Sequence, residues 1–192
     1  MSAVPDLPGF ADPVADAQAA FRAVLHALSH PGQVVTPAAT LLVPAPLPQA
    51  AGALLLTLAD AETPLWLDPA FVPARDWVRF HTGASFAPLG AAGFVVAASL
   101  PPLPGLATGS DEAPQDGASV ILPVAALHEG TRYRLTGPGL AAPASFAARG
   151  LPADFVTFWR DNHALFPRGV DLFLCAGAQL LALPRSVVVE AL

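Results

Sequence analysis

The chain has 192 residues, a net charge of −6 and only 12% charged residues, about half the usual share. All nine basic residues are arginines, and the absence of lysine excludes a pyridoxal-phosphate Schiff base, a Walker-type phosphate loop and a lysine nucleophile, because each needs an ε-amine. The acidic balance argues against nucleic acid or an anionic membrane surface as a partner.

Several features predict one cytoplasmic domain over residues 1–192. Apolar residues make up 54% of the chain, and they cluster in periodic segments that can bury a core. The first ten residues lack the basic and apolar segments of a signal peptide, and no apolar run reaches the roughly 18 residues of a membrane span. The one cysteine, Cys175, cannot form an internal disulfide, which fits a reducing compartment.

Two helices are predicted in the first third of the chain. The first covers residues 13–29, with Asp12 as its N-cap, Pro13 at its first position and Pro31-Gly32 beyond its end. The second covers residues 47–59. This second helix is apolar nearly all round, so we expect it to be buried.

Short β-like runs bounded by Gly, Pro or Asp follow the second helix. We expect a long loop over residues 100–117 and a third helix over 153–164. Together the elements predict an α/β domain in which helices flank a mixed sheet. The predicted strands cover residues 65–67, 78–82, 94–98, 120–124, 133–136, 170–175 and 179–183, with a further one over 187–189.

Arg22 is the first candidate for a functional charge. It shares a polar strip of the first helix with Gln18 and Ser29, beside Val14 and Leu25 at the edge of the apolar arc. This position predicts a half-buried guanidinium, which needs an acceptor. The acceptor is either an aspartate in a structural ion pair or an anion bound beside the following turn.

Arg79 and His81 are the second candidate set. In a strand over residues 78–82 they would share one face, with Phe80 on the other. An arginine and a histidine on one face suit a phosphate or phosphonate oxygen. The same pattern is typical of an exposed sheet face, and the sequence leaves both interpretations open.

Arg132 and Arg134 form a similar pair, because strand alternation places both on one face. The Gly-Pro-Gly turn at residues 137–139 follows them and either presents backbone N–H groups to an anion or is only a turn. No metal site is predicted: His26 and His30 have the four-residue spacing of a zinc pair, but no glutamate lies between them.

Seven short motifs follow one another along almost the whole chain. They are Asp16 to Gly32, Leu54 to Leu67, Arg79 to Thr82, Thr108 to Gly117, Arg134 to Gly139, Phe166 to Asp171 and Leu183 to Arg185. In this order and spacing they resemble the H-subunit (PhnH) family of the bacterial carbon–phosphorus lyase system. The resemblance does not extend to residues 1–10, 36–48 and 141–150.

The resemblance implies a fold that looks like the large domain of pyridoxal-phosphate-dependent transferases, without that cofactor. It implies a homodimer when the chain is alone and a core complex with the other carbon–phosphorus lyase subunits. That complex forms a ribose 1-phosphonate 5-triphosphate from an alkylphosphonate and a nucleoside triphosphate. Displacement of the base takes place on a partner subunit, so the resemblance implies an accessory chain without a cofactor, a metal or catalytic residues of its own.

The resemblance also implies two kinds of functional position: residues that bind an anion or form ion pairs, and residues that set the geometry of turns. The alternative hypothesis is a stand-alone enzyme that binds a phosphonate or a nucleotide through Arg22, Arg79, His81 and Arg134. The candidates for anion binding or ion pairs are Arg22, Ser29, Asp60, Arg79, His81, Thr82, Arg134, Asp171 and Arg185, and the candidates for turn geometry are Pro31, Gly32, Gly137 and Gly139.

Overall fold

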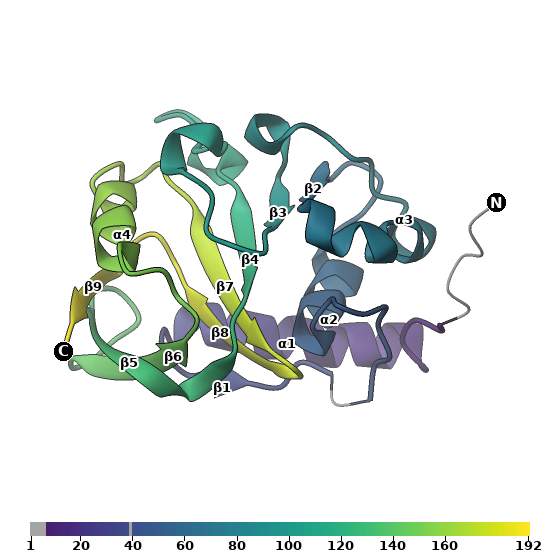
Figure 1. Ribbon diagram of the computed structural model, residues 1–192, viewed down its shortest axis with the longest axis horizontal. Helices are drawn as coiled ribbons and strands as arrows, with labels where there is room; N and C mark the ends of the chain where they lie inside the picture. The colour runs from purple at the N-terminus through teal and green to yellow at the C-terminus, as the bar shows by residue number, and fades with distance from the viewer. Residues whose placement is uncertain (1–6, 39) are drawn as a thin grey trace.

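A computed structural model describes residues 7–38 and 40–192, and its elements form three layers (Figure 1). The central layer is a six-stranded sheet in the order β1-β8-β7-β4-β3-β2. Its strands are β1 (Val34–Val35), β2 (Leu65–Leu67), β3 (Phe94–Val96), β4 (Ser119–Pro123), β7 (Asp171–Ala176) and β8 (Gln179–Leu183). Strands β2, β3, β4 and β7 run parallel, whereas β8 and β1 continue the sheet through antiparallel pairs.

Different elements cover the two faces of this sheet. One face carries the helices α1 (Pro13–Ser29), α2 (Gln49–Leu58) and α3 (Arg75–Thr82). The other face carries α4 (Phe155–His163) and a three-stranded antiparallel sheet of β6 (Ala144–Arg149), β5 (Ala126–Thr136) and β9 (Val188–Ala191). The 3₁₀ helices are η1 (Pro69–Ala74), η2 (Leu89–Ala91), η3 (Leu103–Gly105) and η4 (Pro114–Asp116).

Alternation along the central strands divides the apolar residues between two cores. In β7, Phe173 and Cys175 face the helical layer, while Leu172 and Leu174 face α4 and the small sheet. All four are buried, as expected for strands that are covered on both faces. The predicted mixed α/β architecture is therefore confirmed.

Helix α1 begins and ends where the sequence predicts, but it packs through a different face. The Asp12 carboxylate accepts hydrogen bonds from the N–H groups of Val14 and Ala15, at 3.1 and 3.0 Å, which is an N-cap. The buried positions are Ala20, Val24 and Ala27. These small residues allow a close approach to the sheet and to α2, so the bulkier apolar residues beside them remain outside.

Those outer residues are Val14, Phe21 and Leu25, which are 69%, 49% and 53% exposed. They lie within about 40° of one another around the helix and form what we call the α1 apolar strip. Arg22 lies beside this strip and is exposed. The prediction of a half-buried Arg22 is therefore wrong, because the helix buries Ala20, Val24 and Ala27 and not the side that carries Val14 and Leu25.

The segment predicted as a strand over residues 78–82 is the helix α3, and the strand prediction is wrong. Asp68 caps the preceding 3₁₀ helix through the N–H of Ala70 at 3.0 Å, and Gly83, at φ 71°, ends α3 in the left-handed conformation that favours glycine. Trp77 and Val78 are buried on one side of the helix. The alternation near Arg79 covers too few residues to distinguish a strand from one face of a short helix.

The remaining predicted elements are present with small shifts at their ends, and α2 is buried as expected. The loop over residues 100–117 contains η3 and η4, and β5 is much longer than predicted. Strand β6 was not predicted, because its alanine-rich sequence has low strand propensity and depends on pairing with β5. None of the described helices has the length and apolar character that crossing a membrane requires.

Candidate functional site

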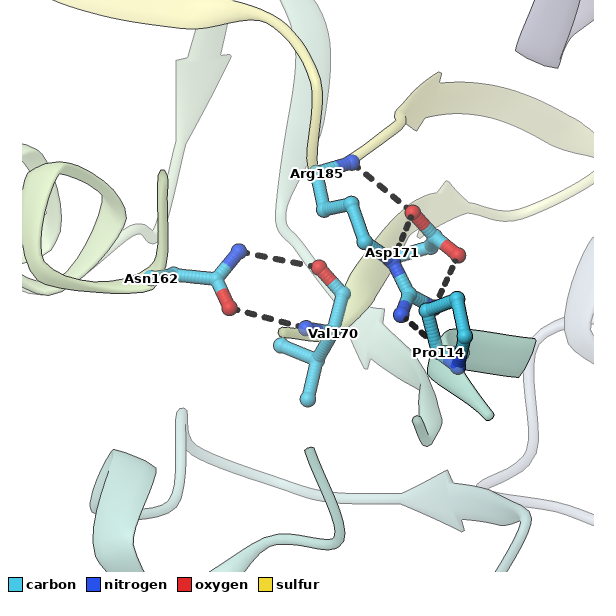
Figure 2. A network of polar contacts seen from close by, with 5 residues as sticks. All are labelled: Pro114, Asn162, Val170, Asp171 and Arg185. Carbon is cyan, nitrogen blue, oxygen red and sulfur yellow. Dashed lines mark hydrogen bonds and ion pairs between the residues drawn. The ribbon is translucent and has the colours of Figure 1, made fainter. Parts of the chain in front are cut away.

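The densest polar arrangement in the described residues surrounds Arg185 and Asp171 (Figure 2). Asp171 opens β7, and Arg185 follows β8. Arg185 donates from its backbone N–H and Nε to Asp171 Oδ1 at 2.8 and 3.2 Å, and from Nη2 to Oδ2 at 2.7 Å. Its Nη1 donates to the carbonyl of Pro114 at 2.6 Å. The guanidinium therefore joins the end of β8, the start of β7 and η4.

Asn162 makes a second set of bonds beside this ion pair. Its side chain is fully buried in α4. Its Nδ2 donates to the carbonyl of Val170 at 2.9 Å, and its Oδ1 accepts from the N–H of the same residue at 2.8 Å. The amide thus replaces a strand partner for the backbone just before β7, as Figure 2 shows.

Two further bonds attach α4 to the segment that leads into β9. The Trp159 indole Nε1 donates to the carbonyl of Val187 at 2.8 Å, and His163 Nδ1 lies 3.1 Å from the carbonyl of Arg185. Helix α4 is therefore connected to both segments that flank the Asp171–Arg185 pair. We call Arg185, Asp171, Asn162 and Val170, together with the Pro114 carbonyl, the β7 network.

Gly117 allows the backbone to pass close to the β7 network. A Cβ at this position would collide with the carbonyl oxygen of Gly169 and would lie 2.5 Å from Arg185 Nη1. Gly169 itself has φ 120° and lies against Asn162. Any larger residue at position 117 would have to displace backbone as well as the guanidinium.

The β7 network is suited to holding structure, because its donors and acceptors bind one another. Each of the three guanidinium nitrogens of Arg185 donates to an internal acceptor. The network also lies at the amino ends of the parallel strands β4 and β7, since Gly117 precedes β4 and Asp171 begins β7. Ligands of open α/β sheets bind at the opposite, carboxyl ends.

At that carboxyl edge the residues that directly follow β2, β3, β4 and β7 are Asp68, Ala97, Val124 and Gly177. Only Asp68 has an ionisable side chain, and its carboxylate caps η1. Among the described residues, no cluster of three or more His, Cys, Asp or Glu side chains could hold a metal ion.

Two predicted turn motifs meet in the structure. The turn at Pro31 and Gly32 lies against the end of β5, where a Cβ on Gly32 would be 2.7 Å from Leu135 Cδ1. Gly139, at φ 83°, lies so close to α1 that a Cβ there would be 2.8 Å from the carbonyl oxygen of Ser29. The glycines therefore permit close backbone contact between the helical layer and the small sheet.

Ser29 and Gly137 complete this contact. The Ser29 hydroxyl donates to the carbonyl of His26 at 3.1 Å. Gly137, at φ 128°, passes Ser186, whose carbonyl oxygen would lie 3.1 Å from a Cβ on the glycine. The Ser29 hydroxyl also lies 3.0 Å from His30 Nδ1, so its polar contacts are local to the end of α1.

Asp60 and Thr82 make local bonds at the ends of helices. The Asp60 carboxylate accepts from the hydroxyl of Thr63 at 2.8 Å and from the N–H of Glu62 at 2.9 Å. These hydrogen bonds, the one from Thr63 first, hold the pKa of Asp60 below its ordinary value. The Thr82 hydroxyl donates to the carbonyl of Val78 at 2.8 Å and accepts from the N–H of Ala84 at 3.1 Å.

Arg79 and His81 do not share a face, because residues two apart in a helix point in nearly opposite directions. His81 Nε2 lies 3.2 Å from the carbonyl of Leu7, which also accepts a hydrogen bond from the Trp77 indole at 3.0 Å. The Arg79 guanidinium lies 5.6 Å from the centre of the Phe86 ring. His81 thus anchors the start of the described chain and does not join Arg79.

The four residues of the alternative anion site lie on three separate elements. Arg22 is on α1, Arg79 and His81 are on α3, and Arg134 is on β5. Helix α3 and strand β5 occupy opposite ends of the molecule (Figure 1). One small ligand therefore cannot contact all four residues.

Arg132 and Arg134 share an exposed face of β5, as predicted, and Tyr133 and Leu135, which alternate with them, are buried. Asn162 was not among the predicted positions. The sequence could have identified Asn162, because its polar amide lies three residues after Trp159 and seven after Phe155. This spacing places it on the apolar face of the predicted third helix.

Comparison with known proteins identifies the family. Residues 8–190 match the family described as bacterial phosphonate metabolism protein (PhnH). The chain is 38% identical over 187 residues to the α-D-ribose 1-methylphosphonate 5-triphosphate synthase subunit PhnH of Rhizobium meliloti (strain 1021), covering 94% of each chain. It is 35% identical over 176 residues to HtxG of Stutzerimonas stutzeri, which is provisionally named a C-P lyase subunit protein, covering 88% of this chain and 83% of HtxG.

Proposed function

Because this chain belongs to the PhnH family, we propose that it is an accessory subunit of the carbon–phosphorus lyase core complex in phosphonate catabolism. In that role it supports formation of ribose 1-phosphonate 5-triphosphate from an alkylphosphonate and ATP. The observation that carries the proposal is the match along 94% of both chains to a subunit named for that synthase.

The geometry favours an accessory role over a catalytic one. Of the four residues that directly follow the parallel strands, Asp68 alone has an ionisable side chain, and it caps η1. The β7 network lies at the opposite edge and satisfies its own donors. General acid–base or covalent catalysis needs groups that face a substrate, so we assign no catalytic residue and no cofactor to this chain.

The α1 apolar strip supports binding to other subunits. Its three members are each at least 49% exposed, and contiguous exposed apolar residues on a helix are typical of protein interaction sites. We assign this strip to contact with another carbon–phosphorus lyase subunit, or with a second copy of the chain in a homodimer when the subunits are absent.

Three further expectations belong to the same proposal. The mainly parallel central sheet is compatible with a relationship to the large domain of pyridoxal-phosphate-dependent transferases. Because the two cores share the strands of one sheet, we propose that residues 1–192 fold as one domain. We also propose that the chain acts in the cytoplasm, where ATP is available.

Co-purification from a host that expresses all subunits of the complex tests the proposal. We expect the tagged chain to retain the other subunits, and a strain that lacks it to lose growth on methylphosphonate as the only phosphorus source. A Phe21→Ser, Leu25→Ser double variant should weaken retention of its partner at least tenfold, whereas the control Val72→Ser, at a position 50% exposed on η1, should not.

Two results would refute the proposal. One is full growth on methylphosphonate without the chain, and the other is a folded wild-type chain that sediments as a monomer and retains none of the subunits. Circular dichroism of each variant establishes that any loss of binding reflects the surface and not unfolding.

A further inference from the structure

A concavity of about 330 Å³ lies where the turn after α1 meets the small sheet. Gly32 and Val34 line it from the side of the central sheet, and His128, Gly130, Arg132 and Ser145 line it from β5 and β6. Its volume is at the lower end of the range for pockets that hold small molecules. Of the residues considered in the sequence, Gly32 and Arg132 line it.

Arg132 is the main positive charge at this concavity. It is exposed, and among residues 7–38 and 40–192 it makes no ion pair, whereas Arg149, Arg160, Arg168 and Arg185 each have an acidic partner. The acidic residue next to the pocket lining, Glu129, lies 3.3 Å from Arg149 Nη1. The charge of Glu129 is therefore matched by Arg149, and that of Arg132 remains available to a ligand.

An irregularity in β5 brings His128 to the same place. Leu127 and Thr131 both pair with Ala148, so the three residues between them bulge out of the ladder. His128 has φ 76° and is the only non-glycine residue with positive φ in the described ranges. Bulges re-aim side chains, and non-glycine residues in this conformation occur disproportionately at ligand sites.

Gly130 makes this bulge possible. It has φ 96°, and a Cβ there would lie 2.6 Å from the carbonyl oxygen of Ala148. Its hydrogen-only side chain also leaves the backbone open to the concavity. Ser145 adds a neutral hydroxyl donor to the lining. It lies on β6, where it pairs with Arg134 of β5.

We propose that this concavity binds the oxyanion of a phosphoryl or phosphonyl group. A guanidinium, an imidazole and a hydroxyl are the donors that such a group requires, and arginine binds its oxygens in a bidentate manner. Only the choice of a phosphorus oxyanion rests on the proposed function. The donors themselves would suit a small oxyanion whatever the proposed function.

The anion belongs either to a free alkylphosphonate or to the polyphosphate of a nucleotide, and calorimetry separates the two sources. The full chain is titrated with methylphosphonate and, separately, with ATP, each against sodium chloride at matched ionic strength. The informative variants are Arg132→Gln, His128→Asn, which tolerates the left-handed conformation, and Ser145→Asp, which places a negative charge in the lining. Arg160→Gln on α4 is the control for general charge, because its side chain is 72% exposed and ion-paired with Asp161.

We expect saturable binding of at least one probe, a Kd raised at least tenfold in Arg132→Gln and Ser145→Asp and severalfold in His128→Asn, and no change in Arg160→Gln. The probe that binds more tightly identifies the source of the anion. Absence of binding of either probe at 10 mM, or equal affinity in the wild type and Arg132→Gln, would overturn the inference. The isolated chain is used, so this result is independent of whether the chain assembles with other subunits.

Discussion

Arg185 and Arg132 occupy opposite environments. The Arg185 side chain is 12% exposed and donates to Asp171 and to the carbonyl of Pro114. Arg132 is exposed, lines a concavity and has no acidic partner among the described residues. The guanidinium donors of Arg185 are therefore used inside the fold, whereas those of Arg132 face the concavity.

The surroundings of Arg185 and Arg132 differ because other segments of the chain cover Arg185 and leave Arg132 exposed. Arg185 lies where η4 and the residue that opens β7 converge on the end of β8, so several backbone and side-chain acceptors surround it. Arg132 lies on the exposed face of β5, beside the concavity that Gly32 and Val34 also line. Mutation should therefore affect stability in the first region and binding in the second.

Replacement of Arg185 should have the largest effect on stability. Arg185→Ala leaves the half-buried Asp171 carboxylate without its cation and the Pro114 carbonyl without a donor. We expect a loss of about 3 kcal/mol in the free energy of unfolding, at the lower end of the range for a broken buried pair. Urea unfolding followed by circular dichroism measures it.

Arg132→Ala is the matched control, because exposed substitutions usually change stability by less than about 0.5 kcal/mol. If both variants lost the same stability, the contrast between the β7 network and the β5 face would be wrong.

Asn162→Ala tests the second half of the β7 network. It leaves the N–H and carbonyl of Val170 without partners in a buried environment, so we expect a loss of about 2–3 kcal/mol. Thermal unfolding of the variant and the wild type measures this loss of stability. Thr157→Ala, at an exposed position of the same helix, should lie close to the wild type, and an Asn162→Ala variant as stable as that control would contradict the role assigned to the amide.

A substitution of Gly117 tests how closely the backbone at this position must pass Gly169 and Arg185. Gly117→Ala should cost about 2 kcal/mol, because the new methyl group meets the Gly169 carbonyl and the Arg185 guanidinium. Gly105→Ala is the comparison, since its Cβ would meet only Leu89 Cδ2 at an ordinary 3.5 Å. Equal urea midpoints for the two variants would show that the backbone can relax at position 117.

The smallest effect on stability is expected from the hydrogen bonds to the exposed carboxylate of Asp60. The Thr63 and Glu62 hydrogen bonds lower its folded pKa, so they stabilise the fold above the ordinary pKa of aspartate, and the contribution is lost as pH falls through the lowered value. Thr63→Val should raise the pKa of Asp60 towards 3.8.

Carbon-detected NMR titration of the carboxyl group measures that pKa. Glu62→Gln serves as the control, because it retains the N–H that bonds to Asp60. A pKa that is the same in Thr63→Val and in the wild type would exclude the hydroxyl as the main cause.

The sequence was sufficient where structure depends on local patterns. The Asp12 cap, the buried α2 and the strand alternation of Tyr133 and Leu135 follow from residue spacing alone. It was insufficient for α3, which continues from η1 and ends at Gly83, and for β6, which depends on a partner strand. The β7 network could not be predicted as a unit, because Pro114, Asn162 and Arg185 meet only through the sheet topology.

The buried thiol of Cys175 can report how often the central strand β7 becomes accessible to solvent. Its thiol is buried between β4 and β8 on the helical face of β7, and burial raises its pKa far above the ordinary value. A thiol reagent should therefore leave the native chain unmodified and react at the rate at which the sheet opens. The rate of alkylation in Arg185→Ala, set against that in Arg132→Ala, then reports how often β7 separates from its neighbours under conditions where the protein remains folded.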